Sequence, residues 1–285
     1  MDFRSTPAGH GLAWFQGALR ILEKNPRGLL GVALLFVVIQ LLPNLLVTNQ
    51  ALSTALSIAL LLLGPALFAG VLHAIGEADA GRPVASGQLF EGLRRPRVRV
   101  QLLLLGVLQV LALFVVALAA QRIFGEDNLA ILMKIAEQAE QNVTPDSVEL
   151  QRIATPLLQT VMVGMVMLFV LLSGMFFAVP RVLFDGRKAL GAFGESLVAC
   201  ATNVLSLTVY GLVLVGVVMV VCVGLMIVGA VCGLLGKLGS FLFLAAFIGV
   251  FAVWLVVSSA GNYRAWREVF GHADAGAPPI VGIEA

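Results

Sequence analysis

Long uncharged apolar runs alternate along this chain with short segments that hold nearly all of its charges. The runs without Asp, Glu, Lys or Arg cover residues 28–76, 100–121, 153–180, 196–236 and 238–263. The hydrocarbon core of a bilayer is about 30 Å thick and takes roughly 20 helical residues. The first run is therefore long enough for two spans, and each of the others predicts one. The runs do not alternate polar and apolar residues as barrel strands do, so the sequence predicts an all-α polytopic membrane protein.

The six predicted transmembrane helices pair into three hairpins. Turn chemistry separates the partners at Val47-Thr48-Asn49-Gln50 and at Gly236-Lys237-Leu238-Gly239. We expect a single integral membrane domain over 1–285, with a helical segment at 121–155 and a short tail at 264–285. The predicted spans lie at about 29–47, 51–74, 100–120, 157–179, 204–232 and 239–260.

A short amphipathic segment precedes each hairpin. These segments lie at 11–25, 86–95 and 188–203, and each ends at a polar break: Asn25-Pro26, Arg95-Pro96 and Thr202-Asn203. Their predicted apolar faces carry Leu12, Phe15, Leu19 and Leu22 in the first, Leu89, Phe90 and Leu93 in the second, and Leu190, Phe193 and Leu197 in the third. Such helices lie in the membrane interface with the apolar stripe toward the acyl chains. The chain thus predicts three repeats of a cytoplasmic interfacial amphipathic helix followed by a hairpin.

The distribution of charge predicts the orientation. Residues 1–27, 77–99, 180–203 and 260–285 hold fourteen of the eighteen Lys and Arg residues. Positive charge accumulates on the cytoplasmic side of membrane proteins, so we expect both termini in the cytoplasm of a bacterial inner membrane. The segment 121–155 has six acidic and three basic residues and is expected in the periplasm.

Two short helices are predicted within that periplasmic segment. Apolar spacing indicates a helix over 128–141, and Thr144-Pro145-Asp146 is typical of the start of a second helix that ends near Ile153. Together they would form a lid or a docking surface, or else a solvated connector.

The composition excludes several classes of protein. Hydrophobic residues make up 60% of the chain and charged residues 12%, with a mean hydropathy of +1.00, whereas soluble domains have about 45–50% apolar and about 25% charged residues. A cytoplasmic enzyme, a disordered chain and a secreted disulfide scaffold are excluded. The net charge of +2 does not indicate nucleic-acid binding, and the membrane lipids are the expected partners, with other membrane proteins as a further possibility.

Catalytic and cofactor motifs are absent from the sequence. The three cysteines have no metal-binding spacing, no nucleotide or hydrolase motif occurs, and no ionisable residue lies at mid-depth in a predicted span. We therefore predict no cofactor, no metal site and no catalytic residues. A membrane-embedded enzyme would need polar groups that converge near His73, Arg181 and Asp185.

Two sets of residues are candidate contact sites. Arg94, Arg95, Arg97 and Arg99 are candidates for contact with anionic lipid head groups, where each basic residue contributes about 1 kcal/mol, although topology alone also demands basic residues there. Gln40, Asn44 and Gln109 are candidates for a polar lining within the membrane, or for hydrogen bonds between spans. Six glycines in the fifth span favour close helix packing over an unwound binding segment: Gly211, Gly216, Gly224, Gly229, Gly233 and Gly236.

Three strings carry a resemblance to a known family: GHGLAWFQGALRILEKNPRGLL, MFFAVPRVLFDGRKALGAFGESLVACATNVLSLTVYGLVLV and SSAGNYRAWREVFG. They resemble an uncharacterised family of proteobacterial multi-pass inner-membrane proteins, with Val179 as one inserted residue before the expected proline. The plan of hairpins with interfacial helices is also similar to the membrane domains attached to some glycerophosphodiester phosphodiesterases. The resemblance implies a location and a plan but no activity.

These observations predict a non-enzymatic membrane component that organises lipids or partner proteins. The alternative is a transporter or lipid-translocating protein, for which a mid-membrane cavity lined by Gln40, Asn44 and Gln109 would be the support.

Overall fold

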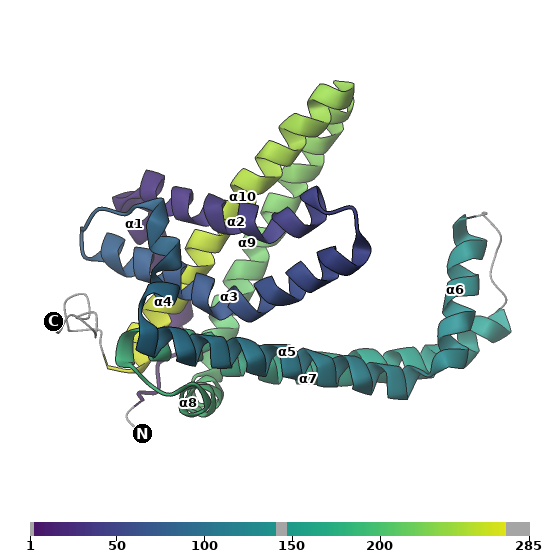
Figure 1. Cartoon of the computed structure of the whole chain (residues 1–285), viewed down its shortest axis with the longest axis horizontal. Coiled ribbons are helices and arrows are strands. Elements are labelled where there is room, and N and C mark those ends of the chain that lie inside the picture. The colour runs from purple at the N-terminus through teal and green to yellow at the C-terminus, as the bar shows by residue number, and fades with distance from the viewer. Residues whose placement is uncertain (1–2, 141–146, 272–285) are drawn as a thin grey trace. The chain divides into compact units, whose positions relative to one another are not determined.

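The described part of the chain is almost entirely helical. The computed structural model describes residues 3–140 and 147–271, with backbone only at 44–46 and 139–140. Within these residues six helices are long and apolar enough to cross a membrane, namely α2, α3, α5, α7, α9 and α10, which confirms the all-α polytopic prediction. The elements, in chain order (Figure 1), are α1 His10–Lys24, α2 Pro26–Leu46, α3 Gln50–Asp79, the 3-10 helix η1 Ser86–Phe90, α4 Glu91–Arg94, α5 Pro96–Phe124, α6 Glu126–Glu140, α7 Ser147–Asp185, α8 Ala189–Thr202, α9 Val204–Gly233 and α10 Gly236–Val269.

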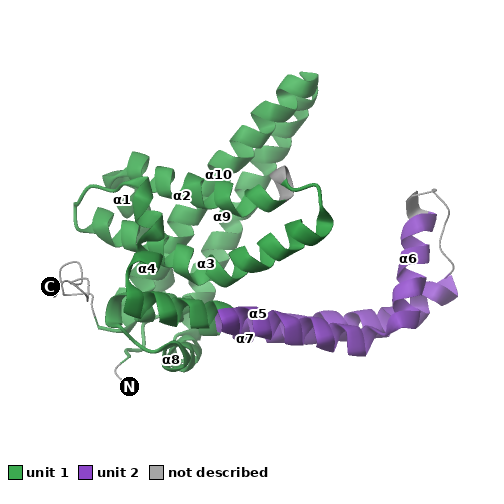
Figure 2. Cartoon of the chain, viewed as in Figure 1, with its two compact units in different colours: residues 1–106, 174–285 green, residues 107–173 purple. Residues whose placement is uncertain are grey.

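The chain divides into two compact units, coloured separately in Figure 2. Unit 1 comprises Met1–Gly106 and Gly174–Ala285, and unit 2 comprises Val107–Ser173. Unit 1 contains α1–α4, α8–α10 and the adjoining parts of α5 and α7. Unit 2 contains α6 and the remaining parts of α5 and α7.

Single residues separate the predicted short helices from the long helices that follow. Asn25 ends α1 and caps α2 by accepting a hydrogen bond from the Gly28 amide at 3.1 Å. Arg95 is extended between α4 and α5, because the residue before a proline avoids helical backbone angles. Asn203 separates α8 from α9. The predicted order of short helix, polar break and hairpin is therefore confirmed.

In unit 2 one prediction is confirmed and another is wrong. The helix predicted at 128–141 corresponds to α6, and Lys134 bonds to Glu149 at the start of α7 at 2.6 Å. The second short helix was expected to end at Ile153, but α7 runs without interruption from Ser147 to Asp185. A proline inside a helix removes one hydrogen bond, and Pro156 does not end this one. Pro145 lies outside the described residues.

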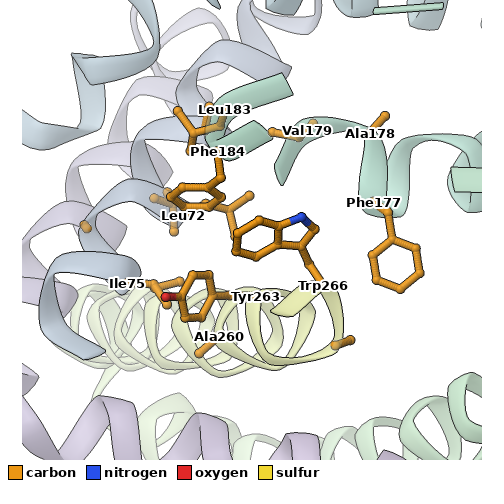
Figure 3. Packing of buried hydrophobic residues seen from close by; sticks show 14 of the residues in the cluster. Leu72, Ile75, Phe177, Ala178, Val179, Leu183, Phe184, Ala260, Tyr263 and Trp266 are labelled. Atoms are coloured by element: carbon orange, nitrogen blue, oxygen red, sulfur yellow. The ribbon is translucent and has the colours of Figure 1, made fainter. Parts of the chain in front are cut away.

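The core of unit 1 is built from α1, the C-terminal halves of α3 and α10, and the end of α7. In this region Trp14, Phe177, Tyr263 and Trp266 are each at most 2% exposed. Phe184 stacks on Trp266 with ring centroids 4.7 Å apart (Figure 3). By contrast, the thirty residues of α9 include only three buried side chains, those of Ser206, Tyr210 and Cys232. Lipid-facing side chains need no protein cover, so packing concentrates at the polar ends of the helices.

The amphipathic pattern is confirmed for the second short segment, where Leu89 is buried and Phe90 and Leu93 pack against the core. In α1 and α8 it is only partly right. α1 buries Gly11, Trp14, Ala18 and Ile21, whereas Leu12 and Leu19 of the predicted stripe are exposed. α8 buries a face of small residues that includes Ala192, Ser196 and Ala199, whereas Leu190 is 75% exposed. α1 and α8 thus pack on the protein through one stripe and leave other apolar side chains exposed.

Glycines allow close approach of helices, but not where the sequence indicated. A Cβ atom on Gly70 would overlap the carbonyl oxygen of Leu89, and one on Gly106 would overlap that of Leu62. The predicted packing role of the fifth-span glycines is wrong for Gly211, Gly216, Gly224 and Gly233, since a Cβ atom on each would meet nothing within 4 Å. Gly229 approaches only the Phe243 ring, and Gly236 has a positive φ in the turn before α10.

Candidate functional site

Charged side chains meet inside unit 1 where the core helices end. Asp79, the last residue of α3, is only 6% exposed in its side chain. It accepts hydrogen bonds from Lys24 at 3.0 Å, from Arg264 at 3.1 Å and from Arg267 at 2.7 Å. One carboxylate therefore holds the ends of α1, α3 and α10 together.

A second network joins α7, α8 and α10 around Arg181. The Arg181 guanidinium donates to Asp185 at 2.6 Å and to Glu195 at 2.5 Å, and it lies 4.3 Å from the centroid of the Phe270 ring. The indole N–H of Trp266 donates to Asp185 at 3.1 Å. These groups satisfy one another, as buried charges must.

Polar contacts also tie the N-terminal segment to the same region. The Trp14 indole N–H donates to Glu268 at 2.8 Å, and His10 forms a short contact with the same carboxylate. The Thr6 backbone N–H and hydroxyl both donate to the Asn203 side-chain oxygen, at 2.8 and 2.9 Å. The two described ends are joined by a hydrogen bond from the Arg4 amide to the Val269 carbonyl at 2.7 Å.

The predicted arginine cluster lies at the junction of α4 and α5, and its members differ in exposure and in ion pairing. Arg95 donates to Glu91 at 3.1 Å and its side chain is 19% exposed. Arg94 lies 3.8 Å from Glu91 and is exposed. Arg97 and Arg99, in the first turns of α5, are exposed and have no ion pair with a described residue. The structure thus leaves Arg97 and Arg99 free for contact with an external anion.

The polar lining predicted from Gln40, Asn44 and Gln109 stays a prediction, because its members lie in different units or outside the described side chains. Gln40 is partly buried in unit 1, Gln109 is partly buried in unit 2, and the Asn44 side chain lies outside the described residues. Next to Asn44 in the sequence, the Pro43 carbonyl accepts a hydrogen bond from the Ser53 hydroxyl at 3.3 Å, which links α2 to α3.

Of the residues named for enzyme chemistry, Arg181 and Asp185 pair with each other in the network above, whereas His73 is buried and its Nδ1 has no described hydrogen-bond partner. Two neighbouring polar groups are held in structural roles. Glu77 receives two hydrogen bonds from Arg82, at 2.5 and 2.7 Å, and the hydrogen bond raises the pKa of the Arg82 guanidinium. Burial raises the pKa of the Cys200 thiol to about 12, which keeps it protonated and unreactive. The described residues contain no group of three His, Cys, Asp or Glu side chains arranged to hold a metal ion.

Acidic and basic side chains of unit 1 differ in exposure and in ion pairing. Six of its seven described acidic residues form ion pairs, and their side chains are at most 28% exposed: Glu77, Asp79, Glu91, Asp185, Glu195 and Glu268. Six basic residues of unit 1 are exposed and have no ion pair with a described residue: Arg4, Arg20, Arg27, Arg97, Arg99 and Lys188. We call these six residues the cationic surface.

Helix termini strengthen the cationic surface. Arg27 lies in the first turn of α2, and Arg97 in that of α5; neither turn contains an acidic residue. The N-terminal amide groups of a helix carry partial positive charge and bind anions. The backbone amides and the arginine side chains therefore both favour an anion at the starts of α2 and α5.

The sequence singled out Arg97 and Arg99 of the cationic surface, but not its other four members or the buried ion pairs. Asp79, Arg264 and Arg267 are separated by about two thirds of the chain, and no local spacing connects them. The available signal was the presence of charges immediately after apolar runs. Comparison of the chain with protein-family models, curated proteins and solved structures gives no match.

Proposed function

We propose that this protein is a non-enzymatic component of the bacterial inner membrane that binds anionic lipid head groups at its cytoplasmic face and so organises lipids or partner proteins. The observation that carries the proposal is the division of charge in unit 1: the acidic groups are paired internally, whereas the cationic surface faces outward. A basic residue near an anionic membrane contributes about 1 kcal/mol, so six of them supply an attraction of about 6 kcal/mol.

The outward apolar stripes of the short helices support the same role. Leu12 and Leu19 of α1 and Leu190 of α8 are exposed beside the cationic surface residues Arg20 and Lys188 in the sequence. An interfacial helix binds through apolar area and through attraction to anionic lipids together. The resemblance to an inner-membrane family agrees with this location.

The lipid preference is tested by native mass spectrometry of the protein released from phosphatidylethanolamine–phosphatidylglycerol nanodiscs. We expect enrichment of phosphatidylglycerol on the wild type, and a loss in the Arg97→Gln/Arg99→Gln variant of about 2 kcal/mol, or roughly 30-fold in affinity. The matched control is Arg122→Gln/Arg152→Gln, which removes two exposed arginines of unit 2 and should retain the wild-type lipid pattern.

Absence of phosphatidylglycerol enrichment on the wild type would refute the proposal. Transfer of labelled lipid between leaflets of proteoliposomes that contain the protein would instead support the translocating alternative. The orientation is tested separately with a reporter active only in the periplasm, which should be active at Ala139 and silent at Ala285. The opposite pattern would reverse the orientation.

A further inference from the structure

A surface pocket of about 250 Å³ lies between α1 and the end of α10. It is distinct from the α4–α5 junction that carries Arg97 and Arg99. Its volume is below the about 300–1,000 Å³ of pockets that bind drug-sized ligands, but corresponds to roughly eight waters at about 30 Å³ each. The pocket therefore has room for a small polar group.

The pocket lining is cationic. Three guanidinium groups line it, those of Arg20, Arg264 and Arg267, against the single carboxylate of Glu268. Glu268 already accepts the Trp14 indole N–H and contacts His10. Asp79 pairs with Arg264 and Arg267 from outside the lining, so three positive charges face two carboxylates and an excess of one positive charge remains. An anion that enters this partly desolvated space is attracted more strongly than in water.

Two of the guanidinium groups retain donors for a ligand. Arg264 donates through one terminal nitrogen to Asp79, and its other terminal nitrogen has no described acceptor. Arg20 is exposed and has no ion pair with a described residue. Each guanidinium offers five N–H donors in a planar fork.

Gly17 provides the space beside these donors. It lines the pocket, and a Cβ atom at this position would lie 3.2 Å from Arg264 Nε and 3.3 Å from its Cγ. A larger side chain at Gly17 would occupy the pocket without removing any charge.

We propose that this pocket binds a phosphate group, supplied either by a lipid phosphomonoester head group or by free phosphate. Paired guanidinium forks match the oxygens of phosphate in bidentate geometry, and Arg20 together with the remaining terminal nitrogen of Arg264 would supply the donors. Arg20 belongs both to this pocket and to the cationic surface, so the inference rests in part on the proposed function. The lipid-preference test replaces Arg97 and Arg99, which do not line the pocket, so failure of one proposal is distinguishable from failure of the other.

The test has two arms, both with the full-length purified protein. In neutral detergent, binding of inorganic phosphate is measured by calorimetry at constant ionic strength. In phosphatidylcholine nanodiscs that contain phosphatidic acid, retention of phosphatidic acid is measured by native mass spectrometry. Binding in the first arm identifies free phosphate as a sufficient ligand, and binding in the second arm alone identifies the lipid head group.

Three variants locate the site. Arg20→Gln removes a charge that has no described ion pair, so it should fold normally and weaken binding about tenfold. Gly17→Leu should abolish binding by filling the pocket. The control Lys24→Gln removes another cation that pairs with Asp79 but does not line the pocket, and it should bind as the wild type does.

Absence of binding in both arms overturns the proposal. Wild-type binding in Arg20→Gln and Gly17→Leu overturns it as well, because the anion would then bind elsewhere. Weaker binding by Arg20→Gln together with wild-type binding by Lys24→Gln supports the proposal, even if Gly17→Leu does not fold.

Discussion

Replacement of Asp79 by Asn should destabilise the protein through the cation that it leaves buried. Arg267 is about 10% exposed in its side chain and lies 2.7 Å from Asp79, whereas Lys24 and Arg264 are 45% and 32% exposed. Removal of one partner of a buried pair costs about 3–5 kcal/mol, and exposed pairs contribute about 0–1 kcal/mol each. Since an amide oxygen remains as an acceptor, we expect Asp79→Asn to cost about 3 kcal/mol.

The free-energy loss is measured as a change in Tm by tryptophan fluorescence of the protein in detergent, because Trp14 and Trp266 are buried at the region in question. For a domain of this size, 1 kcal/mol corresponds to about 2–4 °C, so Asp79→Asn should lower Tm by about 6–12 °C. Lys24→Gln breaks only the exposed pair and should change Tm by less than about 4 °C. If the two variants unfold at the same temperature, then Asp79 does not compensate a buried charge, and the reasoning is refuted.

Three further predictions concern packing and the cysteine. Gly70→Ala should lower the free energy of unfolding by at least about 1–3 kcal/mol, because the added atom overlaps the Leu89 carbonyl. The control Gly64→Ala, with nothing within 4 Å of the added atom, should be neutral or stabilise α3 by up to about 1 kcal/mol. Equal Tm values for the two variants would contradict the close contact at Gly70. Gly216→Leu should leave Tm unchanged, since this glycine faces open space, and a marked fall would show that another molecule packs there. The raised pKa of Cys200 favours its neutral thiol in the folded protein, so the associated stability is complete below pH 9.0 and is lost as the pH rises toward about 12. A variant that retains Cys200 as its single cysteine should therefore resist maleimide at pH 8 until it is unfolded. Rapid labelling of the folded protein would contradict this prediction.

The sequence predicted the architecture well because membrane topology depends on local properties. Apolar length, turn residues and polar breaks act over a few residues, and for this reason Asn25 and Arg95 ended the short helices where expected. The same local signals misjudged the end of the helix expected near Ile153, because the structure continues it through Pro156 into α7.

Faces of helices were harder to predict than their extents. In a soluble protein an apolar stripe marks the side that packs, but in a membrane both lipid and protein accept apolar residues. The pattern therefore identified the Leu12 and Leu19 face of α1 and missed the Trp14 and Ile21 face that the protein buries. The fifth-span glycines were misread for the same reason, since a glycine can face lipid as well as a neighbouring helix.

The sequence by itself determined that this protein resides in a membrane as a set of apolar helices, with its basic residues concentrated in a few segments between them. Only the tertiary structure decided which charges remain available. It placed Arg264 and Arg267 against Asp79 across about two thirds of the chain, and it left Arg97 and Arg99 exposed without such partners. Hydropathy and topology depend on the residues near each position, whereas the pairing of a buried charge depends on which distant helix ends beside it.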